Sequence, residues 1–327
     1  MRAAVRGAMK SRWIVGLAGR KRGSGADSGL DRQIAAALEF QRVARMPELD
    51  SMTPEKAREY AEAGMSPLEL DPEPMAEIID LVAGAVPVRI YVPHNAGPDW
   101  LVYYHGGGGV IGSIRGHDSV TRYLAARTRC TVASVDYRLG PEHKHPAAIE
   151  DATTAWQAMA ARVPSRGKIA VGGDSFGGFL SAHVDRHAQL RGERQPDLQV
   201  LIYPVVDLTF QSPSIERLAN GYLLTRSMLN WFRSHYLHDT DDRRAASPWF
   251  WEDLEGAAPA IVVTAGFDPL VDEGELWAER LRDAGTAVTH RHYPGLVHGF
   301  LSLAGAITTA RAAIDQISTD IVDRFRR

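Results

Sequence analysis

The segment around Ser175 has the pattern of a reactive serine. Ser175 lies between Gly173 and Gly177 in a G-x-S-x-G motif, directly after the apolar segment 168–171, which predicts a buried strand. The residues after Gly178 have helical spacing, so the serine falls at a strand-to-helix corner. Glycine is favoured on both sides of such a tight corner because it has no side chain to clash. The pattern predicts a serine hydroxyl held out of the sheet as a nucleophile.

An acid and a base follow later strands in the order serine, acid, histidine. Asp268 comes just after the apolar segment 261–265, and His298 follows a predicted strand that ends at residue 293. A neutral imidazole can take the serine proton, and a carboxylate orients the imidazole and stabilises its charged form. Asp272 is an alternative acid. We prefer Asp268 because it closely follows its strand, whereas Asp272 begins the next predicted helix.

A glycine run at 106–109 supplies a fourth feature of the same chemistry. It follows a predicted strand at 100–104 and His105. Backbone N–H groups in such a run, together with the N–H of Phe176, can converge on the oxyanion of a tetrahedral intermediate. The run could instead bind phosphate, but the pattern G-x-x-x-x-G-K-[ST] is absent, as is a G-x-G-x-x-G after the first strand. We therefore expect neither a nucleotide nor another cofactor.

The predicted elements that position these residues alternate between strand and helix. Such alternation builds an α/β fold with a mostly parallel sheet flanked by helices, whose ligands bind at the carboxyl ends of the strands. Two helices precede the first strand, and an insertion with one predicted helix interrupts the alternation after residue 204, so we expect a helical cap. The expected strands are 78–82, 88–92, 100–104, 131–136, 168–171, 198–203, 260–265 and 287–293, and the expected helices are 30–45, one from 53, 116–129, 146–161, 226–237 and 306–325.

These elements divide the chain into an arm, a cap and a core. We expect a basic N-terminal arm at 1–27, N-terminal cap helices at 28–72, a core formed by 73–204 and 246–327, and a cap insertion at 205–245. The first 26 residues contain seven basic residues and no acidic one. Two interpretations stay open for this arm: a flexible segment, or a weak attachment to anionic membrane surfaces. A signal peptide is disfavoured because the segment 20–22 is basic where small cleavage-site residues are required.

Composition excludes several other classes of protein. The chain of 327 residues has a net charge of −3, which gives no support for nucleic-acid binding. The single cysteine, Cys130, excludes an internal disulfide, and its apolar surroundings predict a core position. No stretch approaches the roughly 18 to 20 apolar residues of a membrane span. We expect a cytoplasmic protein with no integral membrane segment.

The sequence resembles the hormone-sensitive lipase family of α/β-hydrolases, in its bacterial carboxylesterase branch. The resemblance covers roughly residues 30–325 and implies Ser175 as nucleophile, Asp268 as acid and His298 as base. It also implies an α/β-hydrolase fold with a helical cap, esters of short to medium acyl chains as substrates, and no metal or organic cofactor. The motifs that carry it are His105-Gly106-Gly107-Gly108, Tyr137-Arg138-Leu139-Gly140-Pro141-Glu142-His143, Gly173-Asp174-Ser175-Phe176-Gly177-Gly178, Asp268-Pro269-Leu270 and His298-Gly299-Phe300.

The resemblance also implies an oxyanion hole and exposes two departures from the family. The hole would be formed by the amides of Gly107, Gly108 and Phe176, with His105 orienting the loop and Asp174 holding it in place. The family usually has a small residue after the nucleophile, where this chain has Phe176, and a bulky aromatic after the glycine run, where this chain has Gly109. Substrate preference is therefore expected to differ from that of relatives. A homodimer through the last edge strand is plausible from the family alone.

Several alternatives remain open from the sequence. The same triad could act on an amide, a lactone or an N-acetyl group, and a non-catalytic receptor is disfavoured because all three triad residues are present. Glu142, His143 and His145 could form a metal cluster, although a structural loop is the preferred interpretation. The aromatic run 249–251 could pack in the core or at an interface, or it could form an apolar rim of the substrate site.

Overall fold

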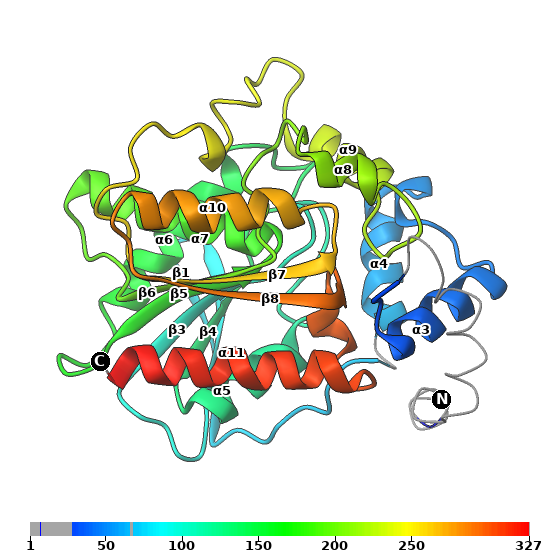
Figure 1. Ribbon diagram of the computed structural model, residues 1–327. Helices are drawn as coiled ribbons and strands as arrows, with labels where there is room; N and C mark the ends of the chain where they lie inside the picture. Colours follow the sequence, from blue (N-terminus) through cyan, green and yellow to red (C-terminus); the bar gives the residue numbers. More distant parts are fainter. Residues whose placement is uncertain (1–6, 8–27, 66–67, 327) are drawn as a thin grey trace.

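The computed structural model describes residue 7, residues 28–65 and residues 68–326. Its centre is an eight-stranded sheet in the order β1-β2-β4-β3-β5-β6-β7-β8 (Figure 1). The strands are β1 (Glu77–Ala83), β2 (Val86–Val92), β3 (Trp100–Tyr104), β4 (Thr131–Val135), β5 (Ile169–Asp174), β6 (Leu198–Ile202), β7 (Ala260–Phe267) and β8 (Val288–Val297). Apart from Gly7, the basic arm predicted at 1–27 lies outside the described residues.

Helices cover both faces of this sheet. The longer ones are α3 (Arg32–Val43), α4 (Pro54–Met65), α5 (Asp118–Thr128), α6 (Ala147–Ala160), α7 (Phe176–Arg191), α9 (Arg226–Tyr236), α10 (Val271–Asp283) and α11 (Thr308–Arg326), with a short α8 (Pro213–Arg217). Figure 1 shows α5 and α11 on one face and α6, α7 and α10 on the other. None of the described helices combines the length and the apolar character needed to cross a bilayer.

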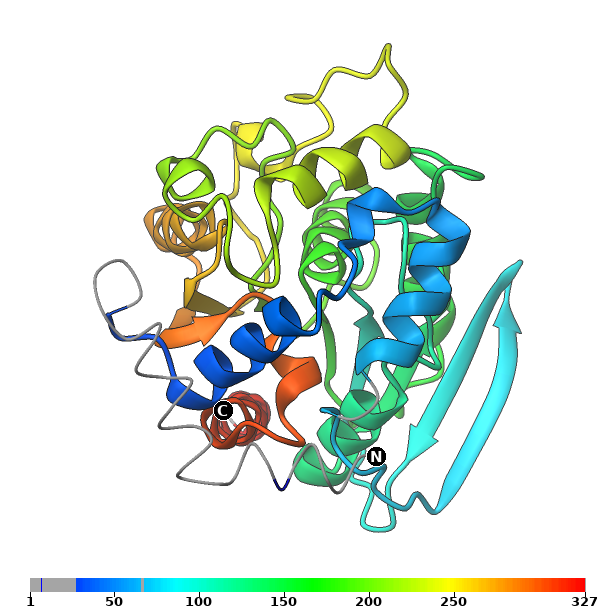
Figure 2. The ribbon, with the colours of Figure 1, turned by 90° about the vertical axis from the view of Figure 1, so that its right-hand side faces the viewer.

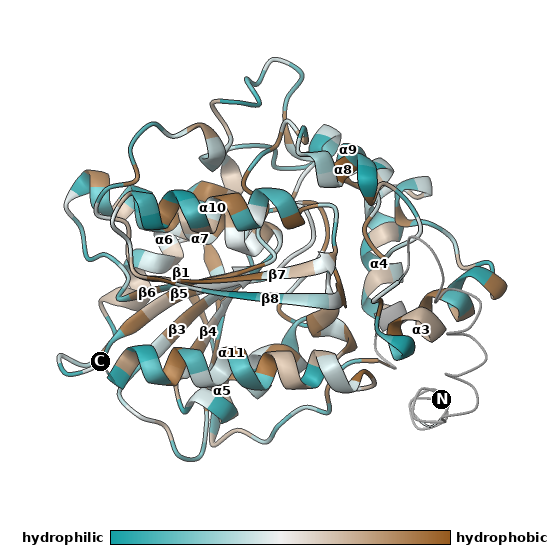
Figure 3. Ribbon diagram, in the orientation of Figure 1, coloured by the Kyte–Doolittle hydropathy of each residue, from teal (hydrophilic) through white to brown (hydrophobic). Residues whose placement is uncertain are grey.

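The pairing of the strands explains why most of them are apolar throughout. β1 and β2 pair antiparallel, as do β2 and β4, while all pairs from β4 through β3 to β8 are parallel. Every residue of β4, β5 and β6 is buried, as expected where helices cover both faces of a parallel sheet. Figure 3 shows the contrast with the edge strand β8, which is largely hydrophilic and partly exposed. The predicted α/β-hydrolase fold is confirmed.

β7 and β8 extend further than the sequence predicted. β8 continues to Val297, although Pro294 and Gly295 appeared to end it near residue 293. A register shift after Ala265 lets the pairing resume at Phe267 and Val297. Such an irregularity accommodates residues that would otherwise end a strand. The consequence is that His298 follows its strand directly.

Four helices gather at one end of the sheet, where the cap was expected. Figure 2 views this end directly, with α3 and α4 in blue beside α8 and α9 in yellow-green. α3 packs through Ile34 and Leu38, which are buried and lie about one turn apart on the helix. Phe40 and Val43 of the same helix are instead exposed, by 58% and 65%. Cys130 is buried just before β4, and burial raises the pKa of its thiol to about 12, which fits a core position.

Candidate active site

Ser175 occupies the sharp corner between β5 and α7. Its backbone has φ 55° and ψ −113°, a conformation that non-glycine residues rarely adopt. The Ser175 N–H donates to the carbonyl of Ile202 at 2.8 Å, which ties the corner to β6. A Cβ on either Gly173 or Gly177 would overlap the carbonyl oxygen of Tyr104 in β3. The two glycines of the motif are therefore required where the corner passes β3.

The structure brings Ser175, His298 and Asp268 into one hydrogen-bonded chain. His298 Nε2 lies 2.9 Å from Ser175 Oγ, and His298 Nδ1 lies 2.7 Å from Asp268 Oδ2. Asp268 is fully buried, and its other oxygen accepts the N–H of Leu270 at 2.8 Å. With Nδ1 donating to the carboxylate, the Nε2 lone pair faces the serine hydroxyl, which is the tautomer that a general base requires.

The alternative acid, Asp272, lies in a different environment. Its carboxylate pairs with Arg217 at 2.8 Å and accepts the N–H of Ser214 at 2.8 Å. These contacts fix α8 against α10. Asp272 therefore has a structural partner of its own, and the geometry favours Asp268 as the partner of His298.

The glycine run approaches the serine with free N–H groups. Gly107, Gly108 and Gly109 have φ values of 118°, 60° and 72°, a sequence of positive angles that only glycine adopts without strain. Among the described residues, none accepts a hydrogen bond from the backbone N–H groups of Gly107 and Gly108. Phe176 is the first residue of α7, and first-turn amides lack an intrahelical acceptor. Backbone N–H groups that have no acceptor within the protein can donate hydrogen bonds to an oxyanion.

Two buried side chains hold the glycine loop in place. Asp174 Oδ1 accepts the N–H of Gly106 at 3.0 Å and the hydroxyl of Tyr103 at 2.7 Å. His105 is fully buried, with Nδ1 2.8 Å from the carbonyl of Gly106, and the Tyr137 hydroxyl donates to the His105 carbonyl. Burial lowers the pKa of His105 to about 3, so its ring is neutral and serves as a hydrogen-bonding support.

His117 is a site residue that the sequence analysis missed. It lies at the start of α5, lines the cavity above Ser175, and has Nε2 3.5 Å from Asp174 Oδ1. Burial disfavours its charged form, but the nearby Asp174 carboxylate outweighs burial and raises the pKa of His117. The same pairing lowers the pKa of Asp174 despite its burial. The signal in the sequence was a histidine at a helix start shortly after the glycine run.

A large apolar cavity opens above these residues. Its volume is about 850 Å³, within the range of small-molecule sites. Ser175, His298 and residues 106–108 line it. Other lining residues come from α3 and the following loop and from the segment 205–236. The apolar wall residues include Ile34, Leu38, Leu49, Val205, Leu208, Leu229 and Phe232.

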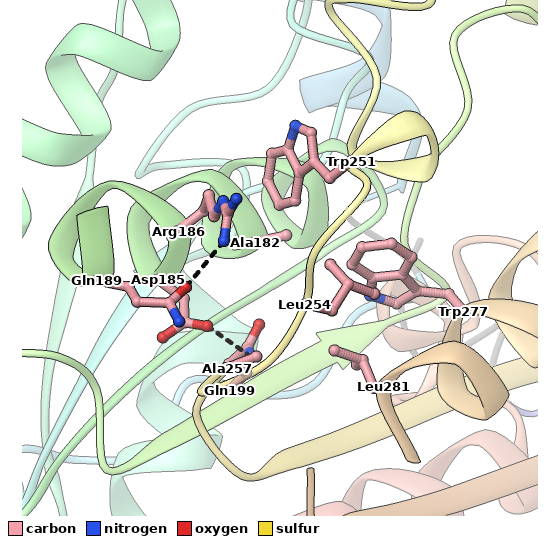
Figure 4. Close-up of a pocket in the computed structure, with 10 residues that line it drawn as sticks. All are labelled: Ala182, Asp185, Arg186, Gln189, Gln199, Trp251, Leu254, Ala257, Trp277 and Leu281. Atoms are coloured by element: carbon pink, nitrogen blue, oxygen red, sulfur yellow. Dashed lines mark hydrogen bonds between the residues drawn. The ribbon is translucent and has the colours of Figure 1, made fainter. Parts of the chain in front are cut away.

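The aromatic run 249–251 lies away from this cavity. Trp251 instead lines a separate hollow of about 10 Å³ with Trp277 and Asp185, drawn in Figure 4. That volume is enough for about one water molecule. Trp249 and Trp251 pack against the buried cluster around Trp277. These tryptophans therefore pack against the protein interior and do not form a rim of the large cavity.

Two of the three residues that suggested a metal cluster have other partners. Glu142 accepts hydrogen bonds from Arg58 of α4, which also donates to the carbonyls of Val110 and Gly140. His145 lies 3.5 Å from Asp241. No group of three metal-ligating side chains is found in the described part of the chain. Glu142 thus connects α4 to the loop beside the glycine run.

A serine after β5, an acid after β7 and a histidine after β8 form the arrangement that is typical of an α/β-hydrolase. A family model described as the alpha/beta hydrolase fold matches residues 101–302, more than half of the chain. The chain belongs to this family, in its group of hormone-sensitive lipase-like esterases, as the sequence predicted.

Relatives of the chain are ester hydrolases. It is 44% identical over 234 residues to the carboxylic ester hydrolase LipN of Mycobacterium tuberculosis, covering 68% of this chain and 62% of that protein. It is 37% identical over 238 residues to the ethyl acetate hydrolase of Pseudomonas putida, covering 69% and 74%. Among solved structures, the ester hydrolase EH1AB1 from the metagenome of Lake Arreo has a TM-score of 0.87 at 36% identity, covering 91% of this chain and 100% of that one.

Proposed function

We propose that this protein hydrolyses carboxylic esters of short to medium acyl chains through an acyl-enzyme on Ser175. The observation that carries the proposal is the continuous hydrogen-bonded chain from Ser175 Oγ through His298 to Asp268. The names of the relatives support ester hydrolysis as the reaction. The apolar cavity supports a substrate with an apolar acyl or alcohol part.

In the proposed mechanism, Ser175 Oγ attacks the ester carbonyl carbon while His298 Nε2 takes the hydroxyl proton. The carbonyl oxygen becomes an oxyanion, stabilised by the N–H groups of Gly107, Gly108 and Phe176. Collapse of the intermediate breaks the bond to the alcohol, which leaves with the proton from His298. Water then attacks the acyl-enzyme with His298 again as base, and the acid and free Ser175 are released. Asp268 keeps the imidazole oriented and stabilises its charged form.

Hydrolysis of p-nitrophenyl esters from two to sixteen carbons, measured beside the matching anilides, tests this function. We expect turnover of esters that is highest at short to medium chains and abolished in Ser175→Ala. Faster turnover of anilides would instead assign the triad to amides. No turnover of any ester by folded protein would overturn the proposal. The homodimer and the membrane attachment of the basic arm stay predictions.

A further inference from the structure

The two departures from the family pattern meet at one point in the structure. A Cβ placed on Gly109 would lie 2.8 Å from Cζ of Phe176 and 2.9 Å from Cδ2 of Tyr236, too close for real carbon atoms. The space into which a side chain at position 109 would point is therefore occupied by the ring of Phe176. The bulky residue after the candidate nucleophile thus fills the space beside Gly109.

Aromatic contacts fix the ring of Phe176 in this position. Phe176 is 1% exposed and stacks on Phe179, with ring centroids 4.9 Å apart. Tyr236 meets it edge to face at 4.8 Å, with the rings inclined by 76°. Such contacts stabilise an aromatic pair beyond the area that it buries. The ring of Phe176 is therefore held on two sides by neighbouring aromatic rings.

Helix α9 completes the enclosure of the glycine loop. Phe232 and Tyr236 are one turn apart on this helix, so they share a face. A Cβ on Gly108 would overlap the Phe232 ring, and Tyr236 lies against Gly109. The loop that carries the candidate oxyanion donors is thus packed between α9 and Phe176. All three aromatic rings also line the large cavity.

We propose that Phe176 is a specificity-determining residue: its side chain closes the cavity beside the glycine loop and limits the length of the substrate chain accepted there. The inference rests on the proposed ester hydrolysis. It assigns a role to the Phe176 side chain, whereas the oxyanion hole would use only the backbone N–H of this residue. Truncating the side chain leaves that N–H in place and joins the vacated space to the cavity.

The test compares Phe176→Ala and Phe176→Leu with Val184→Ala. Val184 is a fully buried side chain about two turns further along the same helix, and it does not line the cavity, so it is the control for a core truncation in α7. The readout is the ratio of kcat/KM for the twelve-carbon and four-carbon p-nitrophenyl esters. This ratio does not depend on the fraction of protein that is folded. It therefore stays informative if a variant is destabilised.

We expect the ratio to rise at least about tenfold in Phe176→Ala. A rise of this size is what burial of about two further methylene groups of the longer acyl chain would produce. Phe176→Leu should raise it by a smaller factor, and Val184→Ala should leave it unchanged. An unchanged ratio in both Phe176 variants, or an equal rise in Val184→Ala, would overturn the inference. Absence of ester hydrolysis by the wild type would instead overturn the proposed function, and this assignment with it.

Discussion

The side chain of Asp174 accepts a hydrogen bond from the N–H of Gly106 at 3.0 Å, across 68 residues of sequence. Asp174 immediately precedes the candidate nucleophile, and Gly106 begins the glycine run. The bond therefore fixes the loop of candidate oxyanion donors directly to the strand that presents the serine. Positions set this way are held before a substrate arrives, and such preorganisation is a large part of electrostatic catalysis.

Removing the Asp174 carboxylate should impair catalysis more than binding. In Asp174→Ala the N–H of Gly106 and the hydroxyl of Tyr103 lose their buried acceptor, so the glycine loop should shift. We expect kcat to fall by about 10- to 100-fold with little change in KM, since small misplacements of catalytic groups have effects of that size. Asp174→Asn retains an acceptor oxygen and is the control. Steady-state kinetics that show a wild-type kcat for Asp174→Ala would contradict this role.

The two candidate acids can be separated by matched amide substitutions. Asp268→Asn should lower kcat by about 10⁴-fold, because the amide no longer favours the imidazole tautomer that accepts the serine proton. Asp272→Asn should keep kcat within about threefold of the wild type, since Asp272 pairs with Arg217 instead. Rates of p-nitrophenyl ester hydrolysis provide the measurement. A larger loss in Asp272→Asn would reverse the assignment.

The elbow glycines should be required for stability as well as for activity. Gly177→Ala places a methyl group against the carbonyl of Tyr104, so we expect a loss of about 3 kcal/mol or more in the free energy of unfolding. Gly192→Ala is the control, because its φ of 64° is left-handed but nothing lies within 4 Å of the added carbon. It should cost only about 1 to 2 kcal/mol. Urea unfolding curves measure the free energy of unfolding of both variants. Equal losses in the two would show that steric overlap with the Tyr104 carbonyl does not add to the cost of Gly177→Ala.

His183, whose side chain is partly buried, should make the fold sensitive to acid. The ring lies between Phe179 and Trp251, and burial lowers its pKa to about 3 from an ordinary value of 6.5. Below pH 6.5 the imidazole of His183 binds a proton in the unfolded chain but stays neutral in the folded chain until the pH approaches 3. Stability is therefore lost as the pH falls from 6.5 towards 3, by about 1.4 kcal/mol per pH unit.

The matched variant for this effect is His183→Met, which cannot be protonated. Its free energy of unfolding should fall less than that of the wild type between pH 7 and pH 5, by about 2 kcal/mol. The comparison uses the change with pH within each protein, so a lower stability of the variant at pH 7 does not affect it. The same pH dependence in both proteins would show that His183 is not responsible.

Local patterns were sufficient to predict the fold and the residues that meet at the candidate site. Ser175, Asp268 and His298 each follow a strand of a parallel sheet, and the carboxyl ends of such strands share one edge. The end of β8 was misjudged because Pro294 resembles a strand terminator, while the register shift that accommodates it depends on pairing with β7.

The contacts that shape the site could not be predicted in the same way. The pairing of His117 with Asp174 and the contact between Phe176 and Gly109 join segments far apart in the sequence. Spacing within one segment carries no information about such contacts. The sequence did single out Phe176 and Gly109 as unusual, but it did not indicate that the two residues lie against each other in the fold.

Covalent labelling with an organophosphate tests the central claim, that Ser175 is a nucleophile activated by His298, most directly. The intact mass of the protein should increase by one phosphoryl adduct, and the loss of esterase activity should be proportional to the labelled fraction. Peptide mapping should place the adduct on Ser175. Ser175→Ala should remain unlabelled, and His298→Ala should react far more slowly. Equal labelling of Ser175→Ala, or no labelling of folded wild-type protein, would contradict the account.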